Sequence, residues 1–132
     1  MISTKSQYAL KAMVYIALHN NELVKIKDIS KREGISQKYL EQVISLLVKS
    51  QLLKSYRGNN GGYSLIKNVD EYSVYEIIVA VEGALILDFG KDYLSKYWDS
   101  YNETKNNYLK SIKLSNLLDD YNEYIGASDY CI

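Results

Sequence analysis

Residues 26–66 decide the fold, and their sequence is IKDISKREGISQKYLEQVISLLVKSQLLKSYRGNNGGYSLI. The apolar spacing predicts a short helix over about 27–33, and Gly34 after it can take the left-handed conformation that ends a helix. Ser36 is a typical N-cap residue and predicts the first turn of another helix. Two helices joined by a tight Gly-Ile-Ser turn form a helix-turn-helix.

The helix that follows Ser36 has one apolar and one polar face. Its buried face is predicted to consist of Leu40, Val43, Ile44, Leu47 and Val48, which recur at helical spacing. The major groove of DNA admits one α-helix, whose exposed polar side chains meet the base edges. Gln42 can form paired hydrogen bonds with adenine, and Glu41 can accept one from cytosine. Ser36 and Lys38 can reach phosphates or bases, whereas Glu41 is equally consistent with a solvated carboxylate.

Two short extended runs after this helix predict a β-hairpin. Leu52–Arg57 and Tyr63–Ile66 flank the loop Gly58–Gly62, which is rich in residues that tolerate a positive φ. Arg57 can enter a narrow minor groove or bind a phosphate. The glycines allow close approach of the backbone to the sugar–phosphate chain and offer it N–H donors. An ordinary hairpin turn is the alternative, but the position directly after a helix-turn-helix favours a DNA-contacting wing.

Helices are also predicted on both sides of this stretch. An apolar stripe predicts one from Thr4 to Asn20, and the capping box of Ser73 and Glu76 opens another that ends near Glu82. After an irregular connector over 83–90, we expect a long helix over about 91–113. A last short helix capped by Ser115 and a tail over 126–132 complete the chain.

The long helix has the pattern of a helix that pairs with another helix. Its stripe has heptad-like spacings and consists of Leu94, Trp98, Tyr101, Lys105, Tyr108 and Ile112. The expected dimer interface therefore consists of Leu94, Trp98, Tyr101, Tyr108 and Ile112. Packing of this helix onto the chain's own winged helix is the alternative.

The fold class that follows is mainly α with a small β-hairpin wing, a winged helix-turn-helix with a long dimerisation helix. We expect residues 1–83 to form the DNA-binding domain and residues 84–132 the connector, dimerisation helix and C-terminal tail. No run of about 18 apolar residues and no signal peptide is visible, so the chain is expected to be cytoplasmic without membrane contact.

Charge is divided unequally along the neutral chain. Residues 1–67 carry 11 basic and 4 acidic side chains, a net +7, whereas residues 68–132 carry 5 basic and 12 acidic ones, a net −7. This division favours contact between the first half and a polyanion such as double-stranded DNA, with chance segregation as the alternative. No metal-ligand cluster, nucleophile–base pair or phosphate-binding glycine loop is recognisable, so we expect neither an enzyme nor a cofactor.

Three sequence blocks resemble the signature of the Rrf-type transcriptional regulators. They are SQYALKAM at 6–13, ISQKYLEQ at 35–42 and RGNNGGY at 57–63. The resemblance is strong over about residues 1–83 and extends to the layout of the remainder. It implies a homodimeric winged-helix transcription factor on a palindromic operator. The implied DNA-binding residues are Ser36, Lys38, Tyr39, Glu41 and Gln42 in the helix, and Arg57, Gly58, Asn59, Asn60, Gly61 and Gly62 in the wing.

The connector departs from the cluster-binding members of that family, which have three cysteines there. This chain has no cysteine between Gly83 and Lys110, and Cys131 is its single cysteine. Because thiolates are the ordinary ligands of iron–sulfur clusters, we expect a regulator without a cluster and without a bound metal. Among the cluster-free members, the chain is most similar to repressors of cysteine metabolism, which implies a repressor of cysteine or sulfur metabolism.

The same resemblance gives the C-terminal tail a candidate role. In the cysteine-metabolism repressors, an isoleucine-terminated tail implies binding to cysteine synthase, so Tyr130, Cys131 and Ile132 are candidate partner-binding residues. A frayed chain end without function is the other interpretation. The alternative function is an interaction protein whose main role is to bind and regulate a metabolic enzyme through this tail.

Overall fold

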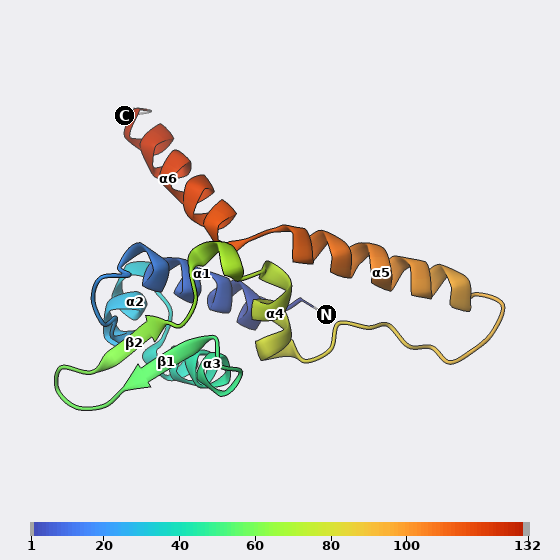
Figure 1. Ribbon diagram of the computed structural model, residues 1–132, viewed down its shortest axis with the longest axis horizontal. Coiled ribbons are helices and arrows are strands. Elements are labelled where there is room, and N and C mark those ends of the chain that lie inside the picture. Colours follow the sequence, from blue (N-terminus) through green and yellow to red (C-terminus); the bar gives the residue numbers. More distant parts are fainter. Residues whose placement is uncertain (1, 131–132) are drawn as a thin grey trace.

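The computed structural model describes residues 2–130, with side chains up to Ala127. Four helices and a hairpin form a body, from which α5 projects to one side and α6 rises at another angle (Figure 1). The fold class predicted from the sequence is confirmed: the chain is mainly helical, with one two-stranded antiparallel sheet. The elements are α1 Thr4–Leu18, α2 Ile26–Glu33, α3 Gln37–Lys49, β1 Leu53–Tyr56, β2 Gly62–Leu65, a 3-10 turn Val69–Glu71, α4 Val74–Glu82, α5 Ser95–Ser111 and α6 Leu114–Tyr130.

The core of the body lies where α1 packs against α3 and α4. Small residues on the buried face of α1, Ala9 and Ala12, let the neighbouring helices approach closely, and Met13 and Ile16 fill the remaining space. The predicted apolar face of α3 is fully buried at Leu40, Val43, Ile44 and Leu47. Each such side chain contributes about 1.5–3 kcal/mol to folding. This core holds α3 so that its opposite face remains in solvent.

The turn between α2 and α3 has the predicted geometry. Gly34 has a φ of 67°, the left-handed conformation in which glycine avoids the strain of a Cβ atom, and its N–H donates to the Ser30 carbonyl. The Ser36 hydroxyl accepts a hydrogen bond from the Tyr39 N–H at 3.1 Å and caps α3. The predicted capping box of α4 is also present, because the Ser73 and Glu76 side chains each bond the other's backbone N–H.

The hydroxyl group of Tyr72 forms hydrogen bonds with both ends of the hairpin. Its side chain is fully buried, and its hydroxyl donates to the Leu52 carbonyl at 2.8 Å. The same oxygen accepts from the N–H groups of Ile66 and Lys67 at 2.8 and 3.0 Å. The chain segments that enter β1 and leave β2 are therefore fixed to one buried side chain.

The connector between α4 and α5 runs outward from the body alongside α5, which then returns toward the body (Figure 1). The Asn102 side-chain amide bonds both backbone groups of Leu87, at 2.9 and 3.0 Å, and the Lys105 ammonium donates to the Leu85 carbonyl at 2.9 Å. A second apolar cluster, formed by Val74, Ile78, Leu85 and Leu109, joins α4, the connector and α5. The base of α5 is thus packed against its own chain.

The long helix is shorter than the sequence predicted. It begins at Ser95 rather than near Lys91, because the Asp92 and Ser95 side chains bond backbone N–H groups and form a turn before it. It ends at Ser111. The carbonyl of the next residue, Ile112, accepts a hydrogen bond from the Val74 N–H at 2.8 Å, and Lys113 forms a β-bridge with Ser73, the N-cap of α4.

The prediction for the C-terminal part was wrong in two respects. Ser115 does not cap the last helix, because the helix already begins at Leu114, and the Asn116 side chain in its first turn accepts from the Lys113 N–H. The helix also continues through Gly126 to Tyr130, so most of the expected tail is helical. Cys131 and Ile132 lie outside the described residues. Over residues 2–130, no helix combines the length and apolar character that crossing a bilayer requires.

Candidate nucleic-acid interface

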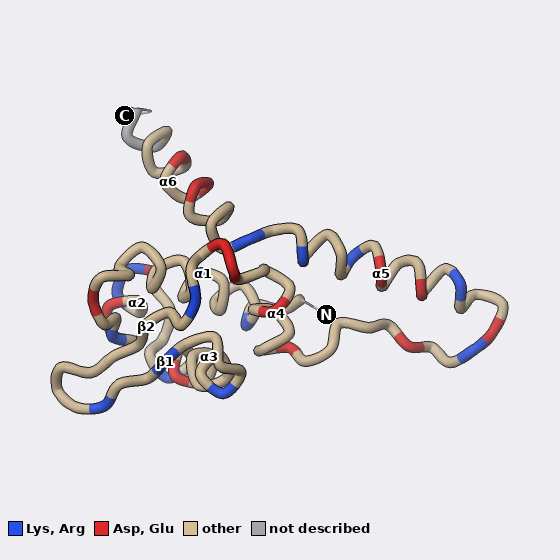
Figure 2. The backbone as a smooth tube through the Cα atoms, viewed as in Figure 1, with Lys and Arg blue, Asp and Glu red and all other residues tan. Residues whose placement is uncertain are grey.

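The predicted reading positions share the solvent-facing side of α3. Ser36, Lys38, Glu41 and Gln42 are exposed, and Tyr39 is half-buried. Lys38 and Glu41 therefore have unobstructed access to a ligand on this side of the body. Basic residues also occur in α3 and at the hairpin tip, whereas α6 carries acidic residues (Figure 2). The acidic excess of the second half is visible in α6, whereas α5 carries residues of both signs.

Two contacts fix the first turn of α3. The Ser36 oxygen already accepts the capping hydrogen bond from Tyr39, so its hydroxyl proton is the group that remains for an external acceptor. The Tyr39 ring packs edge-on against the Tyr8 ring of α1, with centroids 5.2 Å apart. Tyr39 is therefore held by α1, which connects the first sequence block to the second.

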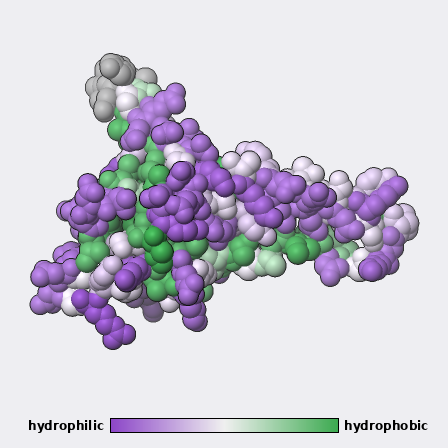
Figure 3. Space-filling view, viewed as in Figure 1, coloured by the Kyte–Doolittle hydropathy of each residue, from purple (hydrophilic) through white to green (hydrophobic). Residues whose placement is uncertain are grey.

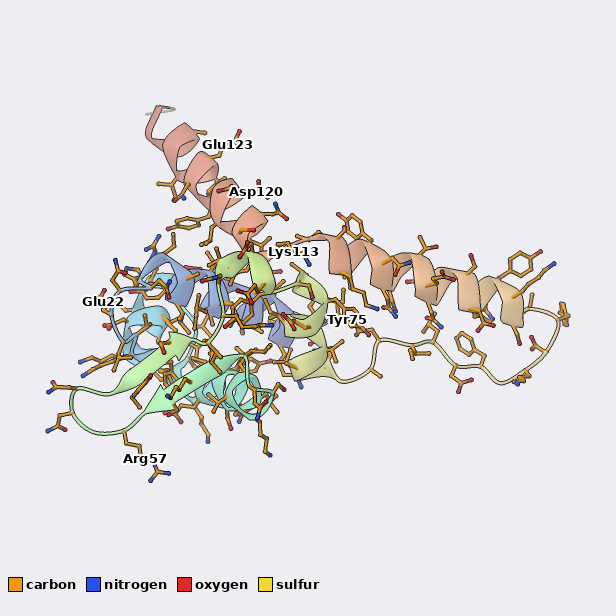
Figure 4. All side chains as sticks on the ribbon, viewed as in Figure 1. Glu22, Arg57, Tyr75, Lys113, Asp120 and Glu123 are labelled. Carbon is orange, nitrogen blue, oxygen red and sulfur yellow. The ribbon has the colours of Figure 1, made fainter. Side chains whose placement is uncertain are left out.

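The hairpin tip presents an exposed guanidinium group. Arg57 points away from the body at the start of the loop (Figure 4). Gly58, Asn59 and Asn60 are exposed beside it. An Arg side chain on a projecting loop can bind a phosphate or enter a minor groove without moving the body.

Gly61 and Gly62 face inward, unlike the rest of the loop. Both are buried, and the Gly61 N–H donates to the Gly58 carbonyl at 3.0 Å instead of facing solvent. A Cβ atom at Gly61 would lie 2.1 Å from the Tyr56 carbonyl oxygen, and one at Gly62 would lie 2.7 Å from the Val24 carbonyl oxygen. These two glycines close the hairpin, and the Gly61 N–H is paired inside it, while contact of Gly61 and Gly62 with DNA stays a prediction.

The segment between α1 and α2 supports the wing, which the sequence did not reveal. Val24 and Tyr63 exchange two backbone hydrogen bonds, at 3.0 and 2.8 Å, and so add a short third chain beside β2. The Lys25 ammonium donates to the Asn59 carbonyl at 2.7 Å. The apolar pair Leu23-Val24 inside an otherwise polar loop was the only sequence signal for this contact.

The residues predicted for dimerisation lie along α5 and at its two ends. Leu94 precedes α5, and Ile112 follows it and packs against the second apolar cluster of its own chain. Trp98 contacts Phe89 of the connector, with ring centroids 5.3 Å apart. Tyr101 and Tyr108, by contrast, are 49% and 66% exposed. The dimer interface from Leu94 to Ile112 stays a prediction, and Tyr101 and Tyr108 are the two most exposed of its side chains.

The comparisons with known proteins agree on one family. A family model described as "Rrf2: Iron-dependent Transcriptional regulator" matches residues 2–120. The HTH-type transcriptional regulator IscR of Photorhabdus laumondii is 48% identical over 82 residues, which cover 61% of this chain and 50% of that protein. The chain thus spans about half the length of the curated relatives it matches.

Solved structures give the same result over most of the chain. IscR of T. potens superposes with a TM-score of 0.80 at 36% identity, covering 94% of this chain and 90% of that one. CymR, the global cysteine regulator of B. subtilis, superposes with a TM-score of 0.78 at 30% identity, covering 90% and 96%. The aligned residues therefore make up at least 90% of this chain in both cases.

The connector does not fit the iron chemistry that the family description mentions. Its side chains from Gly83 to Leu94 include the carboxylates Asp88 and Asp92 but no thiolate and no imidazole. Across the part of the chain that the structure describes, no three His, Cys, Asp or Glu side chains are grouped so that they could hold a metal ion. The polar groups that hold the connector are instead those of Asn102 and Lys105.

Proposed function

Because the chain belongs to the Rrf2 family, a family of transcriptional regulators and not of enzymes, we propose that it binds operator DNA through α3 and the hairpin wing. The single observation that carries the proposal is the exposure of polar and basic side chains on two elements that pack together, α3 and the β1–β2 hairpin. The polar face of α3 is fully solvent-exposed while its apolar face is buried, and Arg57 projects from the adjacent hairpin. A helix in the major groove with a flanking arginine is a familiar arrangement for reading DNA.

Each exposed side chain has a distinct role in this proposal. Gln42 and Glu41 contact base edges, because an amide pairs with adenine and a carboxylate accepts from cytosine. Lys38 and the Ser36 hydroxyl contact phosphates and set the position of α3, and Arg57 contacts a phosphate or the minor groove. Tyr39, whose ring is held by Tyr8, lies at the same DNA-binding surface of α3.

In vitro selection from a random DNA pool tests these roles. Relative to the wild type, Gln42→Ala and Glu41→Ala should each relax the selected sequence at one position per half-site, a loss of about 1–3 kcal/mol of discrimination. Lys49→Ala is the matched control, because Lys49 is exposed in the last turn of α3, away from the proposed contacts. Selected sequences that are unchanged in all three variants would refute base reading by α3.

The protein acts as a homodimer in this proposal. The exposed aromatic side chains Tyr93, Tyr97, Tyr101 and Tyr108 lie on or just before α5, and apolar surface extends along the arm (Figure 3). Apolar surface of this kind indicates a protein interface. A two-fold pair would bring two α3 helices to half-sites about one helical turn apart on a palindromic operator. Tyr101→Glu/Tyr108→Glu should sediment as a monomer where the wild type is a dimer; a wild type that is monomeric at micromolar concentration would refute this.

The regulator acts without an iron–sulfur cluster, and cysteine or sulfur metabolism is the proposed pathway under repression. The connector without thiolates supports the first point, and the structural likeness to the B. subtilis global cysteine regulator supports the second. Mapping of the genomic sites that the protein occupies tests the pathway. Sites without any gene of sulfur metabolism beside them would refute the proposed pathway. Iron and sulfide bound to protein purified without oxygen would refute the absence of a cluster.

Binding of cysteine synthase by Tyr130, Cys131 and Ile132 is the finer proposal for a partner. It rests on the sequence alone, because Cys131 and Ile132 lie outside the described residues. An apolar residue with a free carboxylate is a compact recognition element for an enzyme pocket. Calorimetry with purified cysteine synthase should give binding that is lost when Ile132 is removed. Equal heats for the wild type and for the chain without Ile132 would refute this proposal and would leave the DNA-binding proposal unaffected.

A further inference from the structure

An open cavity of about 680 Å³ separates α1 from α6. We call it the α1–α6 groove; it lies where α6 leaves the body, and Arg32 and Glu33 in the last turn of α2 also line it. Apolar surface is visible at the base of α6 (Figure 3). Its volume is in the range of pockets that bind small molecules. The apolar and aromatic wall is formed by Leu10, Val14 and Leu18 of α1 and by Leu117, Tyr121 and Tyr124 of α6.

Arg32 crosses the groove between two aromatic rings. Its guanidinium carbon lies 5.6 Å from the ring centroid of Tyr15 in α1 and 5.2 Å from that of Tyr121 in α6. Contact with two ring faces holds the side chain in place by cation–π attraction while leaving its N–H groups at the edges. A planar group with five donors fits a carboxylate through paired hydrogen bonds.

The groove carries charges of both signs that do not neutralise one another. Lys11 and Arg32 are the basic lining residues, and Glu33 and Asp120 are the acidic ones. Over residues 2–127, the one ion pair within 4.0 Å is Lys67–Glu76, elsewhere in the molecule. A ligand that carries both an anionic and a cationic group is therefore complementary to this rim, whereas a ligand with one charge meets repulsion from half of it.

Tyr121, which lines the groove, also carries an unpaired polar group. Its hydroxyl oxygen is buried, and it has no hydrogen-bond partner among the described residues. Such groups are uncommon in folded proteins because leaving one unpaired is costly. Because this oxygen is closed off from the groove as well as from solvent, a ligand can pair with it only if the Tyr121 ring turns toward the groove.

From these observations we infer that the α1–α6 groove binds an apolar α-amino acid. The carboxylate pairs with Arg32, the ammonium group pairs with Asp120 or Glu33, and the side chain lies against the apolar wall. Arg32 is two residues before Gly34, the turn into α3. The ligand therefore connects α6 to the helix-turn-helix, and any change it makes in operator affinity is matched by an equal effect of the operator on ligand affinity.

Calorimetry on the full chain without DNA tests the site, so its outcome is independent of the proposed DNA binding. The probes are L-leucine, L-phenylalanine and L-tryptophan, and two analogues of phenylalanine that each lack one charge, 3-phenylpropanoate and 2-phenylethylamine. At least one amino acid should bind. If that is phenylalanine, each analogue should bind at least about tenfold more weakly, because each loses a charge-assisted pair. If leucine or tryptophan binds instead, its own analogues without the amine or the carboxylate replace them.

Two variants and a control complete the experiment. Arg32→Gln should raise the Kd at least about tenfold, and Tyr124→Ala, whose ring is 71% exposed and not part of the core, should also weaken binding. Lys31→Gln removes the same charge from the neighbouring exposed position and should leave the Kd within about twofold. No binding of any of the three amino acids at millimolar concentration would overturn the inference, and so would equal affinity for a singly charged analogue. A change in sedimentation of Arg32→Gln or Tyr124→Ala would also overturn it, because the groove would then be a protein interface.

Discussion

Replacement of Tyr72 by Phe removes the hydroxyl that fixes both ends of the hairpin. The ring remains in its buried position, so the change isolates three hydrogen bonds, to Leu52, Ile66 and Lys67. Each typical hydrogen bond contributes about 0.5–1.5 kcal/mol net, and a buried acceptor left unpaired costs about 1–3 kcal/mol. The bonds to Ile66 and Lys67 are partly solvent-exposed, so water replaces some of their contribution.

The expected loss in the free energy of unfolding is therefore about 2–4 kcal/mol, a large fraction of the 5–15 kcal/mol typical of a domain. Urea unfolding followed by circular dichroism measures it, and the Tm should fall by about 10 °C. Tyr75→Phe is the matched control: its ring lies under the Lys110 ammonium, 4.7 Å away, and no hydrogen bond joins its hydroxyl to another described residue. A loss below about 1 kcal/mol, or equal losses in both variants, would refute the reasoning.

Three further variants test how the wing and the connector are held. Gly61→Ala should lower the free energy of unfolding by about 1–3 kcal/mol, because its Cβ atom would overlap the hairpin backbone; unchanged urea midpoints would contradict this. Lys25→Met removes the bond to Asn59 and should weaken operator binding about two- to fivefold without altering its salt dependence, whereas a flatter salt dependence would mean that Lys25 itself contacts phosphate. Asn102→Ala should speed hydrogen exchange at the Leu87 N–H, and an unchanged exchange rate would show that the connector is held by other contacts.

The sequence predicted those parts of the fold whose signals are local. Gly34, Ser36 and the capping box of α4 each act within a few residues, so their turns and helix starts were predicted correctly. The apolar face of α3 was also visible in the sequence, because burial of one helix face requires a helical period. The exposure of the opposite face, and with it the candidate reading surface, followed from the same pattern.

The parts that the sequence did not reveal depend on residues distant in the chain. The end of α5 and the start of α6 are set by the bridge between Ser73 and Lys113, which no local pattern indicates. Val24 supports the wing by pairing with Tyr63, which is 39 positions away in the chain. The glycines of the wing were assigned to DNA contact because composition indicates flexibility, whereas the direction in which Gly61 faces depends on the closed hairpin.

The central claim is that α3 and the wing bind the phosphate backbone and bases of DNA, and the salt dependence of operator affinity tests it most directly. Fluorescence anisotropy would measure the Kd for a DNA fragment obtained by selection, at about 50 and 200 mM salt. If Lys38 and Arg57 of two protomers each neutralise one phosphate, the affinity should fall about 100-fold over this range. Lys38→Ala/Arg57→Ala should bind more weakly and with a much flatter dependence. An affinity that is independent of salt, or a double variant with the wild-type Kd and slope, would contradict the proposed DNA interface.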